Sequence, residues 1–173
     1  MYFQNISVFK NTSDYLSIFN GVLITDLIVI TLILGGAIHS MVLKKWYKEL
    51  NVSAVIADIL ILFIGIILAR FLYPYIFAQY SLVKFIGLAV LIQVVHDIIF
   101  YQICLAVPRG KSKIMDIFKD YGKEVGINAI LSDSLMMVTS ILIASLLKGM
   151  GGNVNIITLV VAVYLVPYFI YSL

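Results

Sequence analysis

Seven ionisable side chains lie inside long apolar stretches of this sequence, where a charge is costly. They are Asp26, His39, Asp58, Arg70, His96, Asp97 and Asp133. Asp and His side chains accept and release protons, and they also ligate divalent metals. An ionisable group within a membrane-spanning segment is a candidate functional residue, because lipid does not solvate its charge. These residue types therefore indicate binding or relay of protons or cations inside a membrane.

The composition supports the presence of that membrane. Of 173 residues, 62% are hydrophobic and 12% charged, and the mean hydropathy is +1.08. A soluble domain is about one quarter charged, and a short chain cannot hide such an apolar excess in its core. We therefore predict an integral membrane protein. No basic stripe marks a folded soluble module, so we expect no nucleic-acid partner.

Five apolar runs are each long enough to cross a bilayer, which requires about 20 residues. They cover residues 21–43, 52–77, 83–107, 127–147 and 154–173. Residues 112–126 place apolar and charged side chains at helical spacing, which predicts a short amphipathic surface helix. Residues 1–20 are more polar, and we expect them to lie at the membrane interface. No internal repeat or linker is evident, so we predict one all-α polytopic bundle over residues 21–173.

The basic residues predict the orientation of the bundle. The first and third connections carry eight of them, namely Lys44, Lys45, Lys48, Arg109, Lys111, Lys113, Lys119 and Lys123. The opposite side carries three, Lys10, Lys84 and Lys148. Cytoplasmic loops are enriched in Lys and Arg. We therefore expect the basic loops and the C-terminus in the cytoplasm, with the N-terminus outside or in a lumen.

Antiparallel threading at about 1.5 Å per residue gathers most of the polar residues in the cytoplasmic half. This layer consists of Asp58, His96, Asp97, Asp133, His39 and Gln93. It could form a proton or cation site. Alternatively, its members only hydrogen-bond between helices and hold the bundle together, at about 0.6 to 2 kcal/mol each. No two of them have the spacing of a metal-ligand pair on one helix face, so we expect neither a metal nor another cofactor.

A second polar group is expected in the outer half, where Asp26 and Arg70 would form an ion pair. Alternatively, Arg70 extends its guanidinium to the lipid headgroups. Gly65 and Ala69 have the spacing of small residues that allow helices to approach closely. That spacing fits packing within the bundle as well as a homo-oligomer.

Three stretches of the sequence carry a family resemblance. Residues 96–101, 108–110 with 116–126, and 133–137 resemble uncharacterised multi-pass membrane proteins of nucleocytoplasmic large DNA viruses. The resemblance covers about a quarter to a third of the chain. It implies a virus that builds an internal membrane beneath its capsid, and it implies no activity.

Two functional hypotheses follow. No nucleotide-binding, serine-hydrolase or zinc-protease motif is present, so we expect no enzyme. The first hypothesis is a structural protein of a viral membrane that contacts lipid headgroups, capsid or other virion proteins through Lys111, Lys113, Lys119 and Lys123. The second is a small channel or transporter that moves protons or cations through the Asp and His layer.

Overall fold

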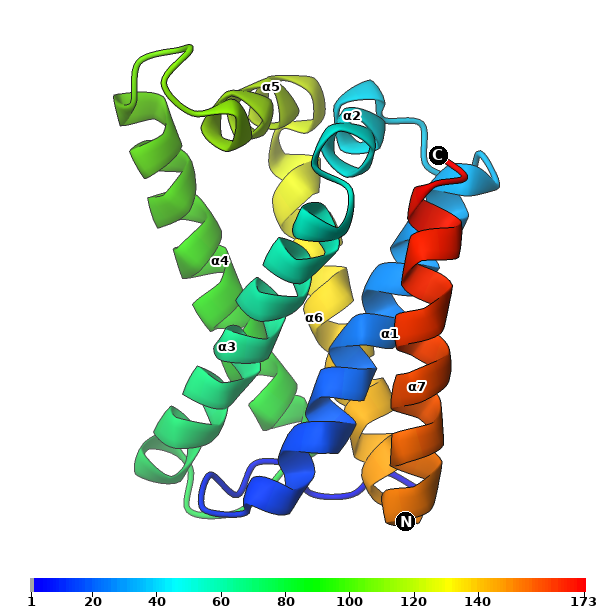
Figure 1. Cartoon of the computed structure of the whole chain (residues 1–173). Helices are drawn as coiled ribbons and strands as arrows, with labels where there is room; N and C mark the ends of the chain where they lie inside the picture. Colours follow the sequence, from blue (N-terminus) through cyan, green and yellow to red (C-terminus); the bar gives the residue numbers. More distant parts are fainter. Residues whose placement is uncertain (1) are drawn as a thin grey trace.

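The protein is a bundle of helices (Figure 1). A computed structural model describes residues 2–173, which form seven α-helices and no strand. Five long apolar helices run alongside one another, namely α1 (Tyr15–Leu34), α3 (Val52–Ile76), α4 (Leu82–Ala106), α6 (Ile127–Lys148) and α7 (Gly151–Ile170). Two shorter helices, α2 (Met41–Leu50) and α5 (Lys113–Val125), lie across one end. The predicted all-α polytopic fold and its surface helix at 112–126 are confirmed.

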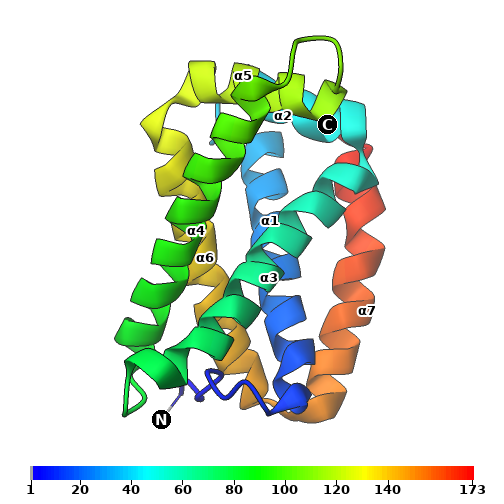
Figure 2. The same cartoon turned by 90° about the vertical axis from the view of Figure 1, so that its left-hand side faces the viewer.

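The bundle has two chemically different ends (Figures 1 and 2). We call the end that holds α2, α5 and the C-terminus the basic end, because all eight basic residues of the first and third connections lie there. The opposite end, which we call the N-terminal end, holds residues 2–14, the connection 77–81 and the turn between α6 and α7. A 3-10 turn, η1 (Thr12–Asp14), leads from there into α1.

The first span differs from the prediction. Its apolar helical stretch covers Thr12–Leu34 instead of residues 21–43. The helix ends early because Gly35 and Gly36 follow, the latter with a φ of 72° that side chains rarely adopt. A new helix, α2, then begins where the Ser40 hydroxyl accepts a hydrogen bond from Leu43 N at 3.0 Å. Residues 12–20 of the segment expected at the interface are therefore part of a span. The predicted end of that span, residues 35–43, is the connection 35–40 and the first residues of a second surface helix.

Each surface helix turns sharply into the span that follows it. A single residue with positive φ makes each turn, Asn51 at 51° after α2 and Gly126 at 59° after α5. Glycine adopts this conformation without strain, and asparagine tolerates it better than most residues. The turns place α2 and α5 nearly crosswise to α3 and α6 (Figure 1).

The chain contains an internal repeat, so the expectation of none was wrong. A span, a surface helix and a span occur twice in the same order, as α1–α2–α3 and α4–α5–α6. Residues 42–70 align without a gap to residues 117–145, and 8 of the 29 positions are identical. The identical pairs are Lys44/Lys119, Lys48/Lys123, Glu49/Glu124, Ala54/Ala129, Asp58/Asp133, Leu60/Leu135, Ile66/Ile141 and Ala69/Ala144. The first spans also correspond, with Asp26 matching Asp97.

Contacts between the two units are reciprocal. Helix α1 packs against α6 as α4 packs against α3, and α2 packs against α5. The Glu124 carboxylate accepts hydrogen bonds from Met41 N and Val42 N at the start of α2. Its counterpart Glu49 forms an ion pair with Lys113, at 3.3 Å, at the start of α5. Such an exchange of equivalent contacts is expected for two units related by a pseudo-two-fold axis along the spans.

Candidate functional site

An acidic cavity lies between the two units near the basic end. Helices α3 and α4 diverge towards that end, and α2 and α5 lie over the gap (Figures 1 and 2). The cavity has a volume of about 280 Å³ and is lined by Asp58 of α3, Asp97 of α4 and Asp133 of α6. A second cavity of about 380 Å³ adjoins it and shares Asp97 and Asp133. No Lys or Arg lines either cavity, and the one basic side chain in the lining is the imidazole of His96.

Aromatic rings form much of the remaining wall. Phe118 contacts Trp46, with ring centroids 4.9 Å apart, and Phe100, at 5.0 Å. Tyr121 lines both cavities. Trp46, Phe118 and Tyr121 come from the apolar faces of α2 and α5, which an amphipathic surface helix turns towards the bundle. The site is therefore an apolar space with a few acidic groups.

Two aspartates of the first unit receive hydrogen bonds from α2. Trp46 Nε1 donates to Asp58 Oδ2 at 3.0 Å, and the Tyr47 hydroxyl donates to Asp26 Oδ1 at 2.8 Å. Burial and the carboxylates of Asp58 and Asp26 raise the pKa of Tyr47 well above its ordinary value, so the hydroxyl keeps its proton and remains a donor. Sequence reasoning missed both donors because it treated this stretch as the polar end of a span. The sequence did contain a signal, because the aromatic residues Trp46 and Tyr47 lie between Lys45 and Lys48, a mixture that is typical of an amphipathic surface helix.

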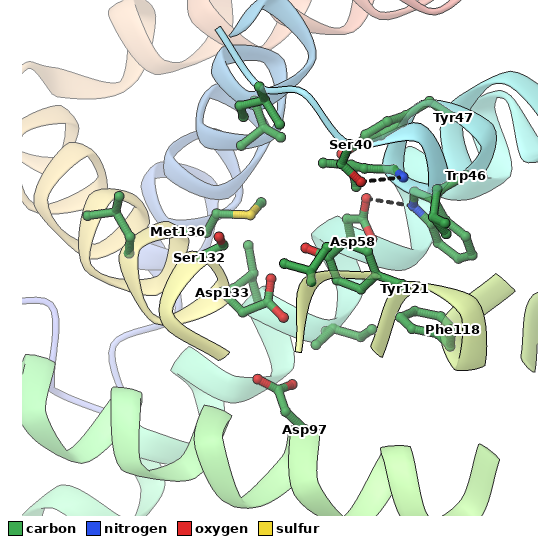
Figure 3. A pocket seen from close by; sticks show the side chains of 18 of the residues that line it. Ser40, Trp46, Tyr47, Asp58, Asp97, Phe118, Tyr121, Ser132, Asp133 and Met136 are labelled. Carbon is green, nitrogen blue, oxygen red and sulfur yellow. Dashed lines mark hydrogen bonds between the residues drawn. The ribbon is translucent and has the colours of Figure 1, made fainter. Parts of the chain in front are cut away.

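The aspartates of the second unit have no such donor from a surface helix. Gln93 Nε2 donates to Asp97 Oδ1 at 2.7 Å, and His96 Nδ1 lies 3.2 Å from the same oxygen. The other oxygen, Asp97 Oδ2, is buried without a hydrogen-bond partner. Asp133 has neither a hydrogen bond nor an ion pair with any residue from 2 to 173. Figure 3 shows the Asp97 and Asp133 carboxylates pointing into the same open space.

Five of the six residues predicted to form the polar layer line the cavity. They are Asp58, Gln93, His96, Asp97 and Asp133. His39 is exposed in the connection before α2 and does not line it, because α1 ends at Leu34. Within residues 2–173, no three His, Cys, Asp or Glu side chains are grouped closely enough to hold a metal ion. The carboxylates thus share a space without forming a chelating cluster.

The predicted Asp26–Arg70 pair is wrong. Arg70 Nη2 lies 3.2 Å from Asp14 Oδ2, and Lys148 Nζ lies 2.7 Å from the other oxygen of Asp14. The Arg70 side chain is fully buried, so it does not extend to headgroups either. The error arose from the start of the first span, which begins nine residues earlier than predicted. At about 1.5 Å per residue, this moves Asp26 about 14 Å towards the basic end, away from Arg70.

One of the four lysines predicted to contact headgroups or partners is unsuitable for that role. Lys119 is buried, donates a hydrogen bond to Val107 O and lies 3.6 Å from Asp116. Lys111, Lys113 and Lys123 are exposed at the basic end. The exposed basic surface is therefore smaller than the sequence indicated.

These features define a class: an all-helical protein with five helices long and apolar enough to cross a membrane, built on a duplicated unit around an acidic cavity. No family model, curated protein or solved structure matches the chain.

Proposed function

We propose that this protein moves protons or other cations across a membrane, and that the acidic cavity is its cation-binding site. The observation that carries the proposal is the meeting of three carboxylates from three spans in one cavity without a Lys or Arg. A carboxylate away from water requires a proton, a cation or a basic partner to neutralise it. Here no Lys or Arg pairs with Asp58 or Asp133, and Asp97 has only the imidazole of His96 beside it, so most of the neutralising charge has to come from outside the protein.

The duplicated unit supports a transport role. Many transporters consist of structural repeats, and their substrate and ion sites lie where the repeats meet. Asp58 and Asp133 are equivalent residues of the two units, and both face the cavity. This arrangement favours transport over the view that the aspartates serve only as interhelical hydrogen-bond acceptors.

Transport across the whole membrane also requires movement at the N-terminal end. Residues 4–14 lie across that end, where Gln4 N donates to Ser145 O at 3.0 Å and Lys148 Nζ donates to Asn5 O at 2.6 Å. Arg70 holds the same segment through Asn11 O at 2.7 Å. In the proposed cycle, these contacts loosen when the cation leaves towards that side.

Reconstitution into liposomes with an imposed pH or cation gradient tests the proposal. We expect flux for the unmodified protein and a loss of about tenfold or more in Asp97→Asn and Asp133→Asn, because each change removes one of the charges that bind the cation. Asp120→Asn is the matched control, since Asp120 pairs with Arg109 on the surface of α5 at 2.6 Å. Equal flux in all four proteins, or none in the unmodified protein, would exclude this mechanism.

A structural role in the membrane of a large DNA virus is the second proposal. It is supported by the sequence resemblance and by the exposed Lys111, Lys113 and Lys123, which could contact anionic headgroups, capsid or other virion proteins. Purified virus particles should then contain the protein at a fixed ratio to the capsid protein. A protein confined to host membranes and absent from particles would contradict this role.

A further inference from the structure

The internal repeat gives the acidic cavity a counterpart within the same molecule. In the first unit, aromatic side chains of α2 occupy the space beside the aspartates. Tyr47 donates to Asp26, and Trp46 donates to Asp58. Both donors combine a large apolar ring with one polar hydrogen. The first unit therefore shows which kind of group fits beside this pair of aspartates.

The second unit lacks the equivalent group. The position of Tyr47 is taken by Gly122, and that of Trp46 by Tyr121. A Cβ atom on Gly122 would come within 2.4 Å of the Tyr101 ring of α4, so the large residue is on the span instead of the surface helix. As a result, neither Asp97 nor Asp133 receives a hydrogen bond from α5, and the second cavity opens beside Gly122, Tyr101 and Asp133. Asp97 Oδ2 is buried without a partner, as Asp26 Oδ2 is in the first unit.

We propose that this space binds a small organic cation with an apolar body, whose cationic group lies between Asp97 and Asp133. The inference rests on the proposed function and specifies its ligand. In the second unit, the ligand would occupy the space beside the aspartates that Tyr47 and Trp46 occupy in the first unit. Its positive charge would take the place of their hydrogen-bond donors. Binding sites for small molecules are typically about 300–1,000 Å³, so the two adjoining cavities, at about 280 and 380 Å³, suit a ligand with one aromatic ring.

The walls favour an organic cation over the alternatives. Trp46, Phe100 and Phe118 present aromatic rings, which attract alkylammonium groups through their faces. An inorganic divalent ion would need several converging ligands, and residues 2–173 group no three acidic, His or Cys side chains for this purpose. A phospholipid headgroup would bring its phosphate, which the carboxylates repel and no lining Lys or Arg offsets. The ligand is therefore a free organic cation.

A pair of isosteric probes separates charge from shape. Benzyltrimethylammonium carries a quaternary nitrogen, and 2,2-dimethylpropylbenzene has a carbon in the same place. We would measure equilibrium binding of each radiolabelled probe to the full chain in maltoside micelles, with empty micelles as background. Fluorescence of Trp46, which is the only tryptophan and lines the cavity, reports whether the bound probe is in this site.

Variants then identify the groups that recognise the charge. Asp97→Asn and Asp133→Asn should each weaken binding of the cation about tenfold and leave the neutral probe nearly unchanged. Asp26→Asn is the matched control, because Asp26 is the counterpart of Asp97 but lines neither cavity. The paired change Tyr101→Ile with Gly122→Tyr copies the Ile30 and Tyr47 of the first unit into the second, and it should abolish binding of the cation.

The outcomes separate this inference from the proposed function. Saturable binding of the cation that depends on Asp97 and Asp133 supports the inference, whether or not flux is seen. Absence of such binding, equal effects of Asp26→Asn, or displacement of the cation by phosphatidylcholine added to the micelles overturns it. Proton flux that requires Asp97 without cation binding would leave the proposed function standing and remove only this ligand class. Cation binding without any flux would support this ligand class and contradict the proposed transport function.

Discussion

Asp14 forms ion pairs with two other spans at the N-terminal end of the bundle. Its side chain is 1% exposed, and its two oxygens lie against Arg70 and Lys148, which belong to different spans. It therefore joins α1 to both α3 and α6. A buried ion pair contributes little compared with an apolar replacement, but removal of one partner leaves an uncompensated buried charge. The loss of Asp14 would therefore lower the free energy of unfolding mainly through the cost of leaving the fully buried Arg70 unpaired.

Asp14→Asn should lower the free energy of unfolding by about 3 kcal/mol, because the amide cannot neutralise Arg70. Asp26→Asn is the matched comparison. Asp26 is equally buried, but its partner is the uncharged Tyr47 hydroxyl, which can also donate to an amide oxygen, so we expect a loss of about 1 kcal/mol or less. Thermal unfolding in maltoside micelles measures both. A larger loss of stability in Asp26→Asn than in Asp14→Asn would contradict the stabilising role of the Asp14 ion pairs.

The sequence predicted which residues are polar and buried better than it predicted their partners. Depth along a helix placed Asp58, Asp97 and Asp133 near one another correctly, since their spans were located to within a few residues. Arg70 and Asp26 were paired incorrectly because that inference depended on where the first span begins. A polar side chain at the start of a span, such as Asp14, gives no sign in the sequence that it lies inside the protein.

At the scale of elements, one glycine sets how closely α1 and α6 approach. A Cβ atom on Gly21 would lie 2.5 Å from Ser140 O and 2.9 Å from Ala144 Cβ. Small residues of this kind allow helix backbones to come together in a membrane. The equivalent position in α4 is Ile92, and the α3–α4 contact is less extensive than the α1–α6 contact. The duplicated unit is therefore packed unequally on its two sides.

Gly21→Ala should separate α1 from α6 and destabilise the bundle by about 1–3 kcal/mol, since two of the clashing atoms belong to the backbone of α6. Gly87→Ala is the control in another span. It has no atom within 4 Å of the added Cβ and should be neutral or stabilising by up to about 1 kcal/mol, through its helix propensity. Unfolding by SDS titrated into mixed micelles measures both. Similar stability of the two variants would contradict the close packing at Gly21.

Hydropathy located four of the five spans almost correctly, because a run of about 20 apolar residues has few alternatives to crossing a membrane. It failed for the first span, where α2 contributes apolar residues that extend the run beyond Leu34. The repeat escaped notice for a related reason. Its first spans align with an offset of 71 residues and its later parts with an offset of 75, so no single period applies. The turns at Asn51 and Gly126, which are 75 residues apart, mark the register of the later parts.

At the scale of the whole molecule, an odd number of spans places the two termini at opposite ends. The basic end carries Arg109 and seven lysines from the connections, whereas the N-terminal end carries Lys10, Lys84 and Lys148. Lys148 is also paired with Asp14, which reduces the free positive charge at its end. We propose that the basic end faces the cytoplasm, as loops rich in Lys and Arg do. The acidic cavity would then lie on the cytoplasmic side of the membrane.

Single cysteines at the two ends test this orientation. Cys104 is the only native cysteine and is buried, so Cys104→Ser provides the background. Gln79→Cys places a thiol in the exposed connection of the N-terminal end, and Lys111→Cys places one in the exposed connection of the basic end. In intact cells, a membrane-impermeant maleimide should label the first variant, if the protein is in the plasma membrane, and label the second only after the membrane is permeabilised. The reverse pattern would place the acidic cavity on the outer side, and a cation bound there would be one taken from outside the cell.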